Sequence, residues 1–241
     1  MSQVNRTASI RKLILALGLL SPSLFSLPSL AEGSSSSDNT KQLFAETGVT
    51  SNNVEHGVTQ SQQSWSLHST FGYKLGQIAM MGISGSSVQY PDLQENLNLR
   101  LFFGVKFDLN PTNTLILKYD LNRYFQSGAR NGAIVTAEDK FMGYHVAIEQ
   151  NSNWEGVGQS ATWFGFGKEL ELGAGVMAEA ELGYTQLGVV GVRNYFDIMA
   201  SVGTALSDIF LKLSATTTTQ PGQFDGRGGS FLFITANVKF Q

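Results

Sequence analysis

Residues Leu97-Asn98-Leu99-Arg100-Leu101-Phe102-Phe103-Gly104-Val105-Lys106-Phe107-Asp108-Leu109 alternate between apolar and mostly polar side chains. Successive side chains of a β-strand point to opposite faces, so this stretch predicts a strand with one apolar and one polar face. It is about twice as long as the usual strand of ~5–6 residues in a globular protein.

The same alternation recurs along the chain, in residues 115–122, 142–149, 176–185, 196–202, 209–216 and 232–240. A soluble β-sandwich also alternates. Three features favour a transmembrane barrel instead: the strands are about as long as a tilted bilayer-crossing strand, single charges stand in mid-strand, and no helical periodicity is present in this part. In lipid only helices and closed barrels satisfy their backbone polar groups. We therefore expect an all-β, antiparallel, up-and-down outer-membrane barrel.

The composition excludes several other classes of protein. Of the 241 residues, 15% are charged and none is cysteine, whereas soluble domains carry about 25% charged residues. A disulfide scaffold and a cysteine-based zinc site are excluded. The mean hydropathy of −0.04 is too low for a bundle of membrane helices.

The first residues predict an export signal. Arg6, Arg11 and Lys12 precede an apolar run, and Ser29-Leu30-Ala31 offers small residues for cleavage. We expect a signal peptide at 1–31, a flexible polar leader at 32–41 and the barrel at 42–241. Removal of the signal makes the net charge more negative than −3, which argues against nucleic acid as a partner. The expected location is the outer membrane of a Gram-negative bacterium.

Turn lengths predict the number of strands. Eleven strands are evident, but bacterial barrels have an even number, with short periplasmic turns and longer outer loops. A further strand at residues 133–137, followed by a turn at 138–140, gives about 12 strands. Ten strands, with one weak strand left in a loop, is the alternative.

Two segments resemble known sequences. Residues 50–61, Thr-Ser-Asn-Asn-Val-Glu-His-Gly-Val-Thr-Gln-Ser, resemble the opening motif of the TorF-type porin family, and 84–88 and 95–104 are similar to later elements of that family. In this chain His56 stands where the family has arginine, and Asn53 and Glu55 replace aromatic residues. The resemblance implies a porin-like barrel without a defined substrate. The last strand, ending at Phe240, resembles the signal that outer-membrane assembly machinery recognises.

The alternation also predicts which charged side chains face the lumen. We expect lumen-lining positions at Arg100, Lys106, Lys118, Asp120, Glu179, Glu181, Asp197 and Lys212. Charges of both signs predict weak ion selectivity. A narrow pore and a lumen plugged by ion pairs remain alternatives. A twelve-stranded barrel is intermediate in width between small barrels, which side chains fill, and large barrels, which enclose a wide channel. The loops are short, so we expect no large plug.

The remaining candidates for chemistry are few. Glu179 and Glu181 share one face of a strand, but such a pair is more often balanced by lysines than used in catalysis or calcium binding. No nucleophile motif surrounds His56, His68 or His145, so we expect no enzyme, metal or cofactor.

Aromatic girdles are expected at Trp65, Tyr73, Tyr119, Tyr124, Phe125, Tyr184 and Phe240. The expected function is passive diffusion of small polar solutes or ions among outer-membrane lipids. A non-conducting structural or adhesive barrel and a lipid hydrolase are the alternatives, and the oligomeric state is open.

Overall fold

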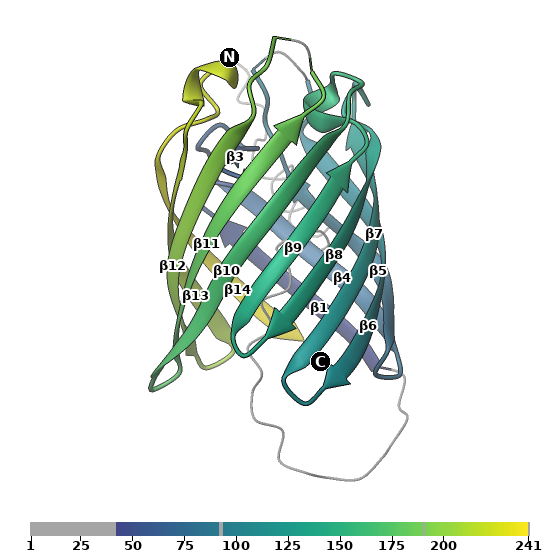
Figure 1. The fold of residues 1–241 in the computed structure, drawn as a ribbon, viewed down its shortest axis with the longest axis vertical. Coiled ribbons are helices and arrows are strands. Elements are labelled where there is room, and N and C mark those ends of the chain that lie inside the picture. The colour runs from purple at the N-terminus through teal and green to yellow at the C-terminus, as the bar shows by residue number, and fades with distance from the viewer. Residues whose placement is uncertain (1–41, 92–93, 190, 241) are drawn as a thin grey trace, which may run out of the picture.

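A computed structural model describes residues 42–91, 94–189 and 191–240. They form a closed, antiparallel, twelve-stranded barrel (Figure 1). Its strands are β1 (Gln42–Thr50), β4 (Ser66–Leu75), β5 (Ala79–Ser87), β6 (Leu97–Asn110), β7 (Asn113–Phe125), β8 (Gly132–Phe141), β9 (Tyr144–Asn151), β10 (Ala161–Gly173), β11 (Val176–Leu187), β12 (Tyr195–Leu206), β13 (Ile209–Thr218) and β14 (Phe231–Phe240). The expected signal peptide and leader lie outside the described residues.

The strands follow one another around the ring, and β1 closes it by pairing with both β4 and β14. The prediction of an up-and-down barrel with twelve strands is therefore confirmed, and the ten-strand alternative is wrong. The short strand inferred at residues 133–137 is the middle of β8, which pairs with β7 and β9.

The turn predicted at residues 138–140 is wrong. β8 continues to Phe141, and the turn falls at Met142-Gly143, whose φ angles are 51° and 79°. Glu138 and Lys140 form an ion pair of 3.4 Å inside the barrel. Polar residues near the end of a strand look like a turn in the sequence, but in a barrel with a polar interior they continue the strand.

The two faces of the barrel differ in polarity. The outward positions carry exposed apolar side chains on all sides, among them Leu67, Phe103, Leu117, Ile148, Phe166, Leu213 and Ile234. Such a face is the surface of a barrel that is surrounded by lipid rather than water. Among the helices that the described residues form, none is long and apolar enough to cross a bilayer.

The two ends of the barrel also differ. At one end, which we call the inner end, two- or three-residue turns join the strands, and β14 finishes there. At the other, the outer end, the connections are longer and include two short 3-10 helices, Trp154–Gly156 and Pro221–Gln223. An apolar cluster of Val58, Ala161, Leu187, Tyr195 and Phe224 packs at this end.

Candidate functional site

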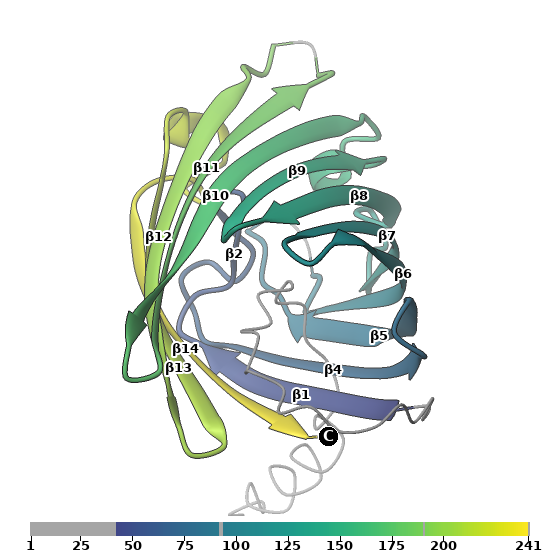
Figure 2. The same cartoon turned by 60° about the horizontal axis from the view of Figure 1, so that its bottom comes forward.

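The connection between β1 and β4 folds into the barrel as a small hairpin. Its strands, β2 (Val54–Glu55) and β3 (Val58–Thr59), form a two-stranded sheet separate from the barrel, and Figure 2 shows β2 inside the ring of barrel strands. The turn residues His56 and Gly57 have φ angles of 47° and 75°. Two consecutive positive φ angles are those of the tight turns that suit a β-hairpin, and glycine adopts them without strain.

The turn of this hairpin spans the bore. Glu55 accepts hydrogen bonds of 2.8 and 3.0 Å from Nη2 of Arg100 on β6. A Cβ added to Gly57 would lie 2.9 Å from Cβ of Asp197 on β12. In the strand order of the ring, β6 and β12 are six steps apart out of twelve and thus face each other. The three residues from Glu55 to Gly57 therefore reach from β6 on one wall of the barrel to β12 on the opposite wall.

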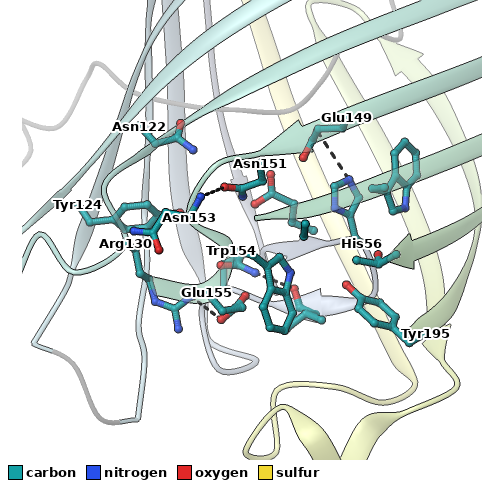
Figure 3. Close-up of a pocket in the computed structure, with 16 residues that line it drawn as sticks. His56, Asn122, Tyr124, Arg130, Glu149, Asn151, Asn153, Trp154, Glu155 and Tyr195 are labelled. Atoms are coloured by element: carbon teal, nitrogen blue, oxygen red, sulfur yellow. Dashed lines mark hydrogen bonds and ion pairs between the residues drawn. The ribbon is translucent and has the colours of Figure 1, made fainter. Parts of the chain in front are cut away.

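His56 is held by an aromatic ring and a carboxylate. Its ring stacks on Trp163 of β10, with centroids 4.4 Å apart and planes at 14°. Its Nε2 lies 3.9 Å from Oε2 of Glu149 on β9 (Figure 3). Burial lowers the pKa of His56, but nearby carboxylates, Glu149 and Glu55 foremost, raise it more, so the pKa is raised above its ordinary value.

Backbone and side-chain contacts anchor the base of the hairpin. The side chain of Thr59 donates to Oδ1 of Asn52, and the Thr59 backbone N–H donates to the carbonyl of Arg227 at 2.8 Å. Val58, only 2% exposed, forms a β-bridge with Gly228. The hairpin is therefore tied to the long loop between β13 and β14, which covers the outer end.

A cavity of about 40 Å³ remains beside the hairpin. It is lined by polar and aromatic side chains, among them His56, Asn122, Tyr124, Glu149, Trp154 and Tyr195 (Figure 3). This is room for about three water molecules. Tyr124, expected in an outer girdle, instead faces this cavity, because it lies at an inward position two residues beyond Asn122.

A carboxylate between two arginines closes the outer rim. Glu155, in the loop between β9 and β10, accepts hydrogen bonds from Nη1 of Arg130 and Nη2 of Arg227. Burial raises the pKa of Glu155, but the two guanidinium groups lower it more, and the pKa ends below its ordinary value. Three outer loops thus meet at one carboxylate.

Solvent exposure changes along the interior. At the inner end the side chains of Lys106 and Asp108 are 42% and 55% exposed, whereas those of Arg100 and Asp120, beside the hairpin, are 6% and 3% exposed. The inward side chains are therefore exposed to solvent at the inner end and buried where the hairpin crosses the interior.

The eight residues predicted to line the lumen all occupy inward strand positions, and most are paired there. Arg100 binds Glu55, Lys106 lies 3.2 Å from Asp108, and Lys118 lies 2.8 Å from Asp120. Lys212 lies 3.7 Å from Glu179, Glu181 lies 3.0 Å from His145, and Asp197 accepts from Trp163 Nε1 at 3.2 Å. Their role in conduction stays a prediction.

The other candidates for chemistry are engaged in side-chain contacts. The ring of His68 is 2.7 Å from Oδ1 of Asn237, and Ser201 donates to Glu179 at 3.2 Å. In the described part of the chain, no group of three or more His, Asp or Glu side chains is placed to hold a metal ion.

Sequence reasoning missed the hairpin and the rim carboxylate. A signal for the hairpin was present, since His56-Gly57 stands between two short pairs of strand-forming residues. For Glu155 and Arg227 no local signal exists, because they are 72 positions apart in different loops.

No protein-family model matches the chain, and no curated protein matches it. Solved structures do share its fold. A protein from a structural study of the in-meso crystallization of membrane proteins is 11% identical with a TM-score of 0.55, over 83% of this chain and 83% of that one. The KdgM porin is 6% identical with a TM-score of 0.53, over 82% and 98%. The COG4313 outer membrane channel from Pseudomonas putida F1 is 12% identical with a TM-score of 0.44, over 90% and 100%.

Proposed function

We propose that the chain is an outer-membrane channel through which small polar solutes or ions diffuse passively, and that the β2–β3 hairpin is its constriction. One observation carries this function: inward charged pairs, interspersed with apolar side chains such as Phe102 and Phe233, are exposed at the inner end, lie inside an apolar exterior, and become buried at the turn Glu55-His56-Gly57. The KdgM porin has the same fold, so a barrel of this kind can serve as a channel.

The export and the membrane location of the channel belong to the same proposal. We infer export by the signal at 1–31, a leader at 32–41, and a barrel domain from 42 that folds into the outer membrane of a Gram-negative bacterium. The terminal strand β14, with an exposed Phe240, would be the segment that the assembly machinery binds. The motif at 50–61, which resembles the TorF-type porins, is the segment that forms the hairpin.

The inward charges set the expected selectivity. Arg100, Lys106, Lys118 and Lys212 face Asp120, Glu179, Glu181 and Asp197 within one interior, so we propose weak selectivity between anions and cations. Lys106 stands at the accessible inner end, and Arg100 at the constriction. Removing either positive charge should shift the preference towards cations.

Single-channel recording in a planar bilayer tests the function. The refolded chain should give discrete current steps, and Lys106→Gln should move the reversal potential in a salt gradient towards that of a cation-selective pore. Lys168→Gln is the matched control, because Lys168 lies on the outward face beside Tyr144. Equal reversal potentials in both variants would contradict the assignment of the lumen face.

A non-conducting structural or adhesive barrel is the second candidate. The observation that favours it is the small cavity of about 40 Å³ at the hairpin. A correctly folded barrel that gives no current steps, with or without the hairpin, would exclude the channel and move the function to the outer loops.

A further inference from the structure

Arg130 and Arg227 converge on one oxygen atom at the outer rim. Nη1 of Arg130 and Nη2 of Arg227 both donate to Oε2 of Glu155, and no hydrogen bond of these two arginines reaches Oε1 in the described residues. The side chains of Arg130 and Arg227 are only 9% and 7% exposed. Two buried cations thus share a single carboxylate oxygen.

Both arginines keep unused donors. Nε of Arg130 and Nη1 of Arg227 are buried and have no hydrogen-bond partner among the described residues. The carboxylate of Glu95 lies 3.7 Å from Nε of Arg130, which is an ion pair but too long for a hydrogen bond. An unsatisfied buried donor is unfavourable, so an anion that offers two oxygens to these guanidinium groups would satisfy the site better than Glu155 does.

Tyr90 holds the two guanidinium groups in place. The Cζ of Arg130 lies 3.7 Å from the centre of the Tyr90 ring and that of Arg227 lies 5.3 Å away. The Tyr90 hydroxyl in turn donates to Gln60, beyond the hairpin, at 2.6 Å. Arginines stacked in this way are pre-organised to bind a carboxylate with two parallel hydrogen bonds.

The backbone of Glu155 is strained while its side chain fills this site. Its φ angle is 52°, in the left-handed region that non-glycine residues rarely adopt. Conformations of this kind are costly and persist only when surrounding contacts enforce them.

We propose that Arg130 and Arg227 form a binding site for the carboxylate of a small solute arriving at the outer end, and that Glu155 occupies this site in the solute's absence. The carbonyl of Arg227 also accepts from the Thr59 backbone N–H at 2.8 Å. Displacement of Glu155 therefore loosens the loop between β13 and β14 that anchors the hairpin. Since this deepens the proposed channel function and rests on it, the binding test below uses no current measurement.

Calorimetry on the refolded barrel in detergent, with acetate as the probe and inorganic phosphate as a second arm, tests the site. Glu155→Ala should bind acetate about tenfold more tightly than the unmodified chain, because the tethered competitor lowers the apparent affinity. Glu171→Ala is the matched control, since it removes an exposed carboxylate at the inner end. Adding Arg227→Gln to Glu155→Ala should abolish binding. Tighter binding of phosphate than acetate would overturn the carboxylate as ligand, and equal binding by both alanine variants would overturn the site.

A second measurement keeps the idea testable should Glu155→Ala not fold. The chain has no cysteine, so Val58→Cys is a single reporter at a position 2% exposed. With Glu155 present, acetate should increase the rate of maleimide labelling several-fold over chloride at equal ionic strength, and Arg227→Gln should remove the difference. Equal rates in acetate and chloride would contradict displacement. Acetate binding without current steps would retain the site and reject the channel.

Discussion

Glu55 and Arg100 are joined across the interior of the barrel, with Nη2 of Arg100 2.8 Å from Oε1 and 3.0 Å from Oε2 of Glu55. The two residues are 45 positions apart in the chain. Both side chains are largely removed from solvent, with Arg100 6% and Glu55 22% exposed. This pair fixes the tip of the hairpin to the wall opposite to β12.

Breaking this pair should open the constriction. Loss of one partner from a buried ion pair leaves an uncompensated charge and costs about 3–5 kcal/mol. Because the hairpin contributes no strand to the barrel, we expect Arg100→Gln to release the hairpin rather than unfold the barrel. Single-channel conductance should rise, and Val58→Cys should become reactive to maleimide.

Asp208→Asn is the control for Arg100→Gln, since Asp208 lies exposed in the turn between β12 and β13. It should leave both conductance and labelling unchanged. A conductance of Arg100→Gln equal to that of the control would show that the pair does not hold the hairpin in the pore.

A side chain at Gly57 should also displace the hairpin. Its φ angle is +75°, which costs about 1–2 kcal/mol for a non-glycine residue, and its Cβ would lie 2.9 Å from that of Asp197. We expect Gly57→Val to speed labelling of Val58→Cys, while Gly76→Val at the inner turn between β4 and β5, where nothing lies within 4 Å of the added Cβ, should not. Protection of Val58→Cys in both variants would contradict close packing of Gly57 on β12.

Conductance should depend on pH through His56. The groups that face it are Glu149, Glu55, Asp197 and Glu181, and their charges raise its pKa above the ordinary value of 6.5 despite burial. A raised pKa means that the protonated ring stabilises the inserted hairpin below pH 6.5, and that this stabilisation is lost as the pH rises through the raised pKa. Conductance should therefore increase from pH 6 towards alkaline pH.

His56→Phe separates this charge from the aromatic stack. Phenylalanine can keep the contact with Trp163 but has no proton to lose. Its conductance should be independent of pH over the range in which the unmodified chain changes. The same pH dependence in His56→Phe would assign the titration to another group.

The outward face should tolerate no charge in mid-membrane. Leu213 is 42% exposed on β13, and its partners Val202 and Ile234 are exposed apolar residues too. Arginine at the bilayer midplane costs a membrane barrel about 2–4 kcal/mol, so Leu213→Arg should lower the free energy of unfolding from lipid vesicles by that amount. Leu213→Ala, which adds no charge, should cost less. Equal unfolding free energies in the two variants would place this face away from the bilayer core.

The barrel follows from its sequence because the cause is local and repeated. Alternation fixes which residues point inwards, as at Arg100 and Lys118, and an even number of strands with short inner turns locates β8 around residues 133–137. The same reasoning misplaced the turn at 138–140, since polarity alone does not separate a turn from the inward face of a strand.

The constriction could not be predicted in the same way. His56 and Gly57 mark a tight turn, but whether that turn points out into solvent or back into the barrel depends on distant partners. Arg100, Trp163 and Glu149 come from β6, β10 and β9, and become neighbours of the hairpin only when the ring has closed.

Removal of the hairpin is the most direct measurement of whether it closes a channel. A chain in which residues 54–59 are replaced by a glycine-serine linker keeps all twelve barrel strands. In a planar bilayer it should give discrete current steps well above those of the unmodified chain, with a lasting open state. Current steps of the same size in both chains, each shown to be folded, would contradict the hairpin as the constriction.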